Sequence, residues 1–293
     1  MTTFRIGELE ISRVEDFIDP RVPVKFLLPE IPDEAIASNL NWLAPRFYDP
    51  TDHTVAIHIQ SWLIRTAHHA ILVDTCGGNH KPRSHFPVFN MRNGPYLENL
   101  RAAGVNPEDI DFVFCTHLHI DHVGWNTKLE NGRWVPTFPN ARYLFSKADY
   151  EAFDPCRRPG GEHLEIDGIF EDSVLPVVEA GLTQMVEGSY AINDNLTIEP
   201  APGHSPGHSL LRATSGDDSG LFIGDAMHHP LQIAVPECNS FNCVDPTVAR
   251  QTRRRILEEC CERHRLLFPG HFAAPHCGRI RRSGSGFAFR PGV

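Results

Sequence analysis

The sequence predicts a layered α/β fold, and two features of the 293-residue chain carry this prediction. Short apolar runs of strand length recur along it, and stretches with helical spacing lie between some of them. Five of these runs end on or shortly before a histidine or an aspartate, near residues 74, 115, 200, 223 and 268. Functional side chains of α/β proteins gather where strands end and loops begin, so we expect these strand ends to build one polar site.

The first half of the chain predicts five strands and two helices. In order, the strands are 4–11, 53–65, 70–74, 110–115 and 140–145, and the helices are 95–103 and 147–153. The first helix carries Tyr96 and Leu100 at helical spacing and is followed by Gly104, a typical helix stop. The stretch after the first strand is rich in proline and aromatic residues, so residues 1–50 are expected to form an irregular arm or cap.

The second half predicts strands over 196–200, 209–213, 221–223 and 266–268, and a helix over 246–264. A Gly/Pro-rich loop is expected over 155–168. The helix carries Ile256 and Leu257 on one side, whereas Arg253 and its two following arginines are expected in solvent. No linker divides the chain, so we predict a single domain over residues 1–293.

Composition limits the classes of function. The chain is 41% hydrophobic and 22% charged, which is typical of a globular protein, and its formal net charge is -10. Nucleic-acid binding is disfavoured because it needs clustered basic residues. We find no signal peptide and no apolar run of membrane-spanning length, so a cytoplasmic location and no membrane partner are expected. The eight cysteines are scattered, which favours free thiols.

The segment Thr116 to His122 holds three histidines and one aspartate directly after a buried strand. At the end of a strand, residues i and i+2 face the same way, so His117 and His119 can bind one cation. The turn that follows can direct Asp121 and His122 towards a second cation. Chance histidines rarely cluster in this way, and the segment therefore predicts a metal site.

This segment resembles the His-x-His-x-Asp-His signature of the metallo-β-lactamase superfamily, and the resemblance extends from about His53 to Phe272. It implies a four-layer αβ/βα sandwich of two mixed sheets with helices outside, holding two metal ions. The resemblance also implies the ligands: His117, His119 and His204 for the first metal, Asp121, His122 and His271 for the second, and Asp225 bridging both. Each of the three remote ligands follows a predicted strand.

Imidazole and carboxylate ligands without thiolate suit zinc, and also iron, manganese or cobalt. The expected cofactor is two divalent ions, with zinc first. A hydroxide that bridges the metals would attack the substrate, and Asp121 would pass a proton to the leaving group.

In acyl-homoserine lactonases a tyrosine stands three residues after the bridging aspartate, where this chain has His228. That imidazole can still donate a hydrogen bond to an oxyanion, so we expect His228 to be catalytic. Asp74 resembles the family's ligand-orienting aspartate.

The resemblance is greatest to the lactonase-like and methyl-parathion-hydrolase-like branches. It implies hydrolysis of a lactone, a carboxylic ester or a related small acyl substrate. Hydrolysis of organophosphate triesters is an alternative. An iron-dependent oxidoreductase on the same fold and a metal-stabilised binding protein without catalysis are alternatives from other classes. The arm over residues 1–50 would either cap the pocket or pack against a second subunit, which leaves a homodimer open.

Overall fold

The computed structural model describes residues 3–157 and 167–293, and contacts divide the chain into two compact units. Unit 1 comprises Met1–Phe17 and Ile59–Tyr190, and unit 2 comprises Ile18–His58 and Ala191–Val293. The described residues form two seven-stranded sheets and one two-stranded sheet. Both large sheets mix parallel and antiparallel pairs, which confirms the predicted α/β class with two mixed sheets. The assignment of residues 1–293 to a single domain stays a prediction.

The first large sheet has the order β1-β2-β3-β4-β5-β8-β9. Its strands are Thr3–Ile6, Leu9–Pro23, Thr54–Arg65, Ala70–Val73, Phe112–Phe114, Arg142–Ser146 and Thr183–Val186. Strands β4, β5, β8 and β9 are parallel to one another, and β4 and β5 end at the same edge. The side chains of β4 and β5 are mostly buried, which explains why these two strands are continuous apolar runs in the sequence. Asp74 follows β4 at this edge, and the histidine-rich segment from Thr116 to His122 follows β5.

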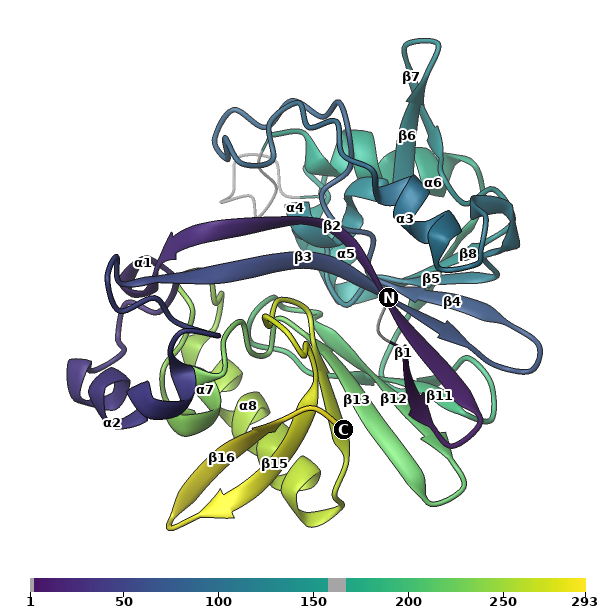
Figure 1. Ribbon diagram of the computed structural model, residues 1–293. Helices are drawn as coiled ribbons and strands as arrows, with labels where there is room; N and C mark the ends of the chain where they lie inside the picture. The colour runs from purple at the N-terminus through teal and green to yellow at the C-terminus, as the bar shows by residue number, and fades with distance from the viewer. Residues whose placement is uncertain (1–2, 158–166) are drawn as a thin grey trace. The chain divides into compact units, whose positions relative to one another are not determined.

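Short helices and a hairpin complete unit 1 (Figure 1). The helices are α3 (Tyr96–Ala102), α4 (Ile120–Val123), α5 (Lys147–Phe153) and α6 (Leu175–Glu179), with 3₁₀ turns at Pro107–Asp109 and Gly124–Asn126 and a π-helical turn at Phe170–Val174. Strands β6 (Thr127–Glu130) and β7 (Arg133–Pro136) form the hairpin, which we did not predict. Most of the predicted loop over 155–168, residues 158–166, lies outside the described residues.

The second large sheet has the order β10 to β16 in sequence. Its strands are Tyr190–Ala191, Leu196–Pro200, Ser209–Ser215, Asp218–Gly224, Leu266–Pro269, Gly278–Ser283 and Gly286–Pro291. β13 and β14 are its parallel pair, so the chain leaves both at the same edge. The helices of unit 2 are α1 (Val24–Leu27), α2 (Asp33–Leu43), α7 (Leu231–Ala234) and α8 (Pro246–Glu262). Asp245 caps α8 by accepting from the backbone N–H groups of Thr247 and Val248.

The amino-terminal residues are more regular than we predicted. A single strand over 4–11 is wrong, because the chain turns at Gly7, whose φ of 54° is readily adopted by glycine. β1 and β2 then pair as a hairpin, and β2 continues to Pro23. Residues 3–17 are therefore sheet strands of unit 1 rather than an irregular arm, and α1 and α2 of unit 2 follow them.

The helix α8 corrects a second expectation. Arg253 is 1% exposed, whereas Arg254 and Arg255 are exposed as predicted. Arg253 lies on the buried face because Ile256 and Leu257 follow it at helical spacing and are themselves buried. No helix in the described parts of the chain combines the length and apolar character needed to cross a bilayer. The eight cysteines are free thiols, as expected.

Candidate metal centre

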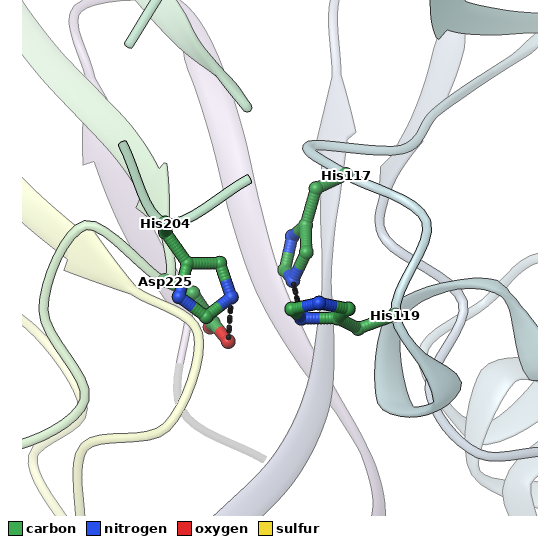
Figure 2. Close-up of side chains that lie close together, drawn as sticks. All are labelled: His117, His119, His204 and Asp225. Carbon is green, nitrogen blue, oxygen red and sulfur yellow. Dashed lines mark hydrogen bonds and ion pairs between the residues drawn. The ribbon is translucent and has the colours of Figure 1, made fainter. Parts of the chain in front are cut away.

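In unit 1, His117 and His119 follow the carboxyl end of β5 and approach each other closely. Nε2 of His117 lies 2.9 Å from Nδ1 of His119, and Figure 2 shows the two rings meeting at these nitrogens. His117 is fully buried, and Thr116 places its hydroxyl 3.1 Å from the other ring nitrogen of His117. The two-residue spacing therefore brings two imidazoles together, as predicted from the sequence.

Asp121 and His122 lie on α4, a single helical turn where we expected only a turn of the loop. Nε2 of His122 lies 3.6 Å from Oδ2 of Asp121. The backbone N–H of Thr75 donates to the carbonyl of His122 at 2.8 Å. The backbone N–H of Gly124 donates to the carbonyl of Cys76 at 2.7 Å. These bonds hold α4 against the segment that leaves β4.

Asp74 orients His122 from the end of β4. Its Oδ2 lies 2.9 Å from Nδ1 of His122, and its Oδ1 accepts from the backbone N–H of Thr116 at 2.7 Å. Because Nδ1–H of His122 donates to this carboxylate, Nε2 is the nitrogen suited to bind a cation. Asp74 has a φ of 62°, a left-handed conformation that is uncommon for residues other than glycine. Asp74 therefore lies where an aspartate that orients a metal ligand must lie, within hydrogen-bond distance of His122.

Gly124 keeps α4 close to the segment after β4. A Cβ atom at Gly124 would lie 2.0 Å from the backbone carbon of Gly77 and 2.5 Å from the nitrogen of Gly78. Both partners are backbone atoms, which cannot move aside as a side chain does. Only glycine fits this contact, and the position of Asp121 and His122 depends on it.

In unit 2, Asp225 follows β13 and is surrounded by three buried imidazoles. Its Oδ2 lies 3.3 Å from Nε2 of His204 and 3.0 Å from Nε2 of His228. Its Oδ1 lies 2.9 Å from Nε2 of His271. Figure 2 shows the His204 ring directed at the Asp225 carboxylate. Asp225 is 2% exposed, and a buried carboxylate is costly unless positive charge or donors compensate it. Such a group is well suited to a divalent cation.

Hydrogen bonds behind these rings fix their orientation. Nδ1 of His271 lies 2.9 Å from the carbonyl oxygen of His58, which leaves Nε2 facing Asp225. The backbone N–H of Asp225 donates to Nε2 of His208 at 3.1 Å, and Nδ1 of His208 lies 3.0 Å from the carbonyl of Ala201. His208 therefore supports the backbone of Asp225 through one ring nitrogen and contacts the Ala201 carbonyl through the other.

His228 and its neighbour His229 have different surroundings. Nδ1 of His229 accepts from the backbone N–H of Leu231 at 3.2 Å, so its proton lies on Nε2, which donates to the carbonyl of Phe47 at 2.7 Å. Burial lowers the pKa of His229 to about 4, so this ring is neutral and structural. His228 instead lies beside the Asp225 carboxylate. The two neighbouring histidines therefore differ in their contacts: His229 binds backbone groups, and His228 faces the carboxylate.

Each unit thus contains imidazole nitrogens and carboxylate oxygens that are buried or partly buried. The seven residues predicted as ligands divide into His117, His119, Asp121 and His122 in unit 1, and His204, Asp225 and His271 in unit 2. Imidazole and carboxylate donors without thiolate fit zinc and other divalent first-row metals. The residues that orient them, Asp74 and the carbonyl of His58, are of the kinds that stand behind metal ligands.

Comparison with known proteins identifies the family of the chain. A model of the metallo-beta-lactamase superfamily matches residues 56–271. The chain is 26% identical over 228 residues to the N-acyl homoserine lactonase AiiA of Bacillus thuringiensis subsp. kurstaki, covering 72% of this chain and 79% of that protein. It is also 30% identical over 128 residues to the N-acyl homoserine lactonase AttM of Rhizobium radiobacter, covering 43% of this chain and 44% of the other.

Solved structures share the fold. The structure of AidC, a dizinc quorum-quenching lactonase, matches with a TM-score of 0.77 at 21% identity and covers 100% of this chain and 97% of that one. The hydrolase AbOPH matches with a TM-score of 0.82 at 23% identity and covers 99% of this chain and 97% of the other. The family match spans well over half of the chain, and the chain belongs to the metallo-beta-lactamase superfamily.

Proposed function

We propose that this protein is a metal-dependent hydrolase that cleaves a lactone, a carboxylic ester or a related acyl substrate. The observation that carries the proposal is the buried Asp225 carboxylate with three imidazole Nε2 atoms within 3.3 Å. The lactonases among its sequence relatives support the same class of reaction.

The proposed centre binds two divalent cations, with zinc as the first candidate. His117, His119 and His204 would bind one ion, Asp121, His122 and His271 the other, and Asp225 would bridge both. Two bound cations would lower the pKa of a water molecule far enough to supply hydroxide at neutral pH, and they would polarise a substrate carbonyl. The ligand types support this assignment, since each residue offers an imidazole nitrogen or a carboxylate oxygen.

Two side chains of the protein would complete the chemistry. The Asp121 side chain is 16% exposed, so one of its oxygens can accept a proton from the attacking water and return it to the leaving group. His228 would donate a hydrogen bond from its imidazole to the substrate oxygen as negative charge develops there. Its position 3.0 Å from Asp225 supports that role, because the reacting carbonyl would be bound beside the bridging ligand.

Exposed apolar side chains in unit 2 support a substrate with an apolar part. The rings of Phe26 and Phe241 lie 4.7 Å apart and are 57% and 47% exposed. Val244 is also exposed, and its backbone N–H donates to the carbonyl of His204 at 3.0 Å. Apolar surface next to the backbone of a proposed ligand would bind an acyl or aryl group.

Substrate assays on stripped and reloaded protein test this proposal. Protein treated with a chelator, and the same protein reloaded with zinc, would be assayed with γ- and δ-lactones, aryl esters and a phosphotriester. We expect lactone or ester turnover that disappears on stripping and returns with zinc. Asp225→Asn would abolish it, whereas the exposed control Asp218→Asn would not.

Three other outcomes would overturn the proposal. Turnover of the phosphotriester alone would favour the triester hydrolase. Iron content with a redox signal and no hydrolysis would favour an oxidoreductase. Metal binding without turnover of any substrate would indicate a binding protein.

A further inference from the structure

Arg253 on α8 is one of the largest fully buried side chains of the protein, and the metal ligands proposed above do not include it. Its Nε donates to the carbonyl of Ala226 at 3.0 Å. Its Nη1 donates to the carbonyls of Pro236 at 2.6 Å and Cys238 at 2.9 Å, and its Nη2 donates to Oδ1 of Asn239 at 3.2 Å. These four acceptors are neutral amide oxygens. The guanidinium therefore serves as a donor of several hydrogen bonds rather than as half of an ion pair.

All four acceptors belong to one stretch of chain, residues 226–239, which begins directly after Asp225. Ala226 is the first residue of this stretch, and the other three acceptors lie at its far end. One planar side chain thus joins both ends of the stretch and closes it into a loop. We call residues 226–239 the His228 loop, because His228 lies inside it.

A second buried side chain connects this anchor to His228. The backbone N–H of His228 donates to Oε1 of Gln232 at 2.7 Å. Nε2 of Gln232 donates to the carbonyl of Cys238 at 3.1 Å, the same carbonyl that accepts from Arg253. Gln232 is fully buried, so these hydrogen bonds are shielded from water. A continuous path of hydrogen bonds therefore runs from Arg253 to the backbone of His228.

We propose that Arg253 is a positioning residue that holds the His228 loop so that the His228 imidazole stays beside Asp225. The inference rests on the proposed function in one respect, because it assigns His228 a contact with substrate. Arginine suits this place because its fork reaches four acceptors in separate directions. Lysine carries the same charge but has a single donor atom, and methionine has none.

Amide hydrogen exchange tests the anchor without requiring activity. Arg253→Met removes the hydrogen bonds of Arg253 to its four acceptors, of which the Cys238 carbonyl keeps its bond from Gln232. We therefore expect faster exchange in the His228 loop by about 10- to 100-fold, the usual effect of losing bonds to a charged group. The exchange rate of the Arg253→Lys variant should lie between those of the wild type and the Arg253→Met variant. The lysine variant also replaces the methionine variant if the latter does not fold. The control is Arg255→Met, an exposed arginine of the same helix whose bond goes to Pro200 outside the loop. Unchanged exchange in the folded Arg253 variants would overturn the proposal.

Kinetics then test whether the anchor acts through His228. With zinc content unchanged, Arg253→Lys should lower kcat more than it raises KM, and adding Arg253→Lys to His228→Ala should cause little further loss. If the losses of kcat from the two substitutions were fully additive, Arg253 would not act through His228. If wild-type protein turns over no substrate, the proposed function fails, while the exchange experiment still decides whether Arg253 anchors the loop.

Discussion

The Oδ2 atom of Asp74 lies 2.9 Å from Nδ1 of His122, and this contact links the end of β4 to a proposed metal ligand on α4. The same carboxylate accepts from the backbone N–H of Thr116, the residue directly before His117. One side chain therefore orients both parts of the histidine-rich segment.

Asp74→Asn should weaken metal binding. The amide cannot accept the Nδ1 proton of His122 as strongly as the carboxylate does, so that ring would lose its fixed orientation. We expect zinc affinity to fall by about 10- to 100-fold, measured by competition with a chromogenic chelator. Asp111→Asn is the matched control, because Asp111 also accepts a backbone N–H, that of Ala70, but lies on an exposed surface. Equal zinc affinities of the two variants would show that Asp74 does not orient a metal ligand.

Gly124→Ala should destabilise the protein. Its new Cβ would overlap the backbone of Gly77 and Gly78, and forced overlap with backbone costs about 3 kcal/mol. Urea unfolding would show the loss, and zinc affinity should fall with it because α4 carries two proposed ligands. The control is Gly286→Ala, whose nearest contact would be an ordinary 3.8 Å. Wild-type stability in Gly124→Ala would contradict the close approach described for α4.

Asp16 should make stability fall as pH rises from about 4 to 6. Burial raises the pKa of Asp16 from 3.8 to about 6, although the N–H of Gly77 and the charge of Arg92 oppose the shift. The folded protein therefore keeps this proton while the unfolded chain releases it. The resulting stabilisation is complete below pH 4 and is lost above pH 6, by about 3 kcal/mol. Asp16→Asn should remove this pH dependence from urea unfolding of metal-free protein. An unchanged profile would show that Asp16 ionises normally.

Phe241→Ala should change substrate preference. If the ring binds the apolar part of the substrate, its loss should raise KM for long-chain acyl substrates by about 5- to 30-fold, corresponding to about 1–2 kcal/mol of lost burial. Short-chain substrates should be affected little. Leu129→Ala, which removes an exposed apolar side chain from unit 1, is the control. A uniform effect over all chain lengths would exclude a role in chain binding.

The buried strands and the residues at their ends were predictable from the sequence. β4, β5 and β14 are fully apolar because both faces of the sheet are covered, so they are visible as continuous runs. The polar residue after each run then marks a candidate site. By contrast, α4 is too short to show helical periodicity, and its position depends on the backbone contact at Gly124, which no local pattern reveals.

The burial of Arg253 and the strands β15 and β16 were not predicted, for different reasons. Arg253 has the hydropathy of a solvent-exposed residue, and its four acceptors lie outside α8, in the segment before the helix. The hairpin β15–β16 did carry a local signal. Ile280 is buried between Arg279 and the exposed Arg281, an alternation typical of a half-buried strand, but the charged residues obscured it. Hydrogen-bond partners far away in sequence are the information that residue patterns lack.

Anomalous X-ray diffraction from zinc-loaded crystals tests the central claim most directly. We predict two zinc peaks: one about 2.0–2.1 Å from imidazole nitrogens of His117, His119 and His204, and one bound by Asp121, His122 and His271. Asp225 should contact both. A single peak, or zinc bound only by residues of one unit, would contradict the binuclear centre.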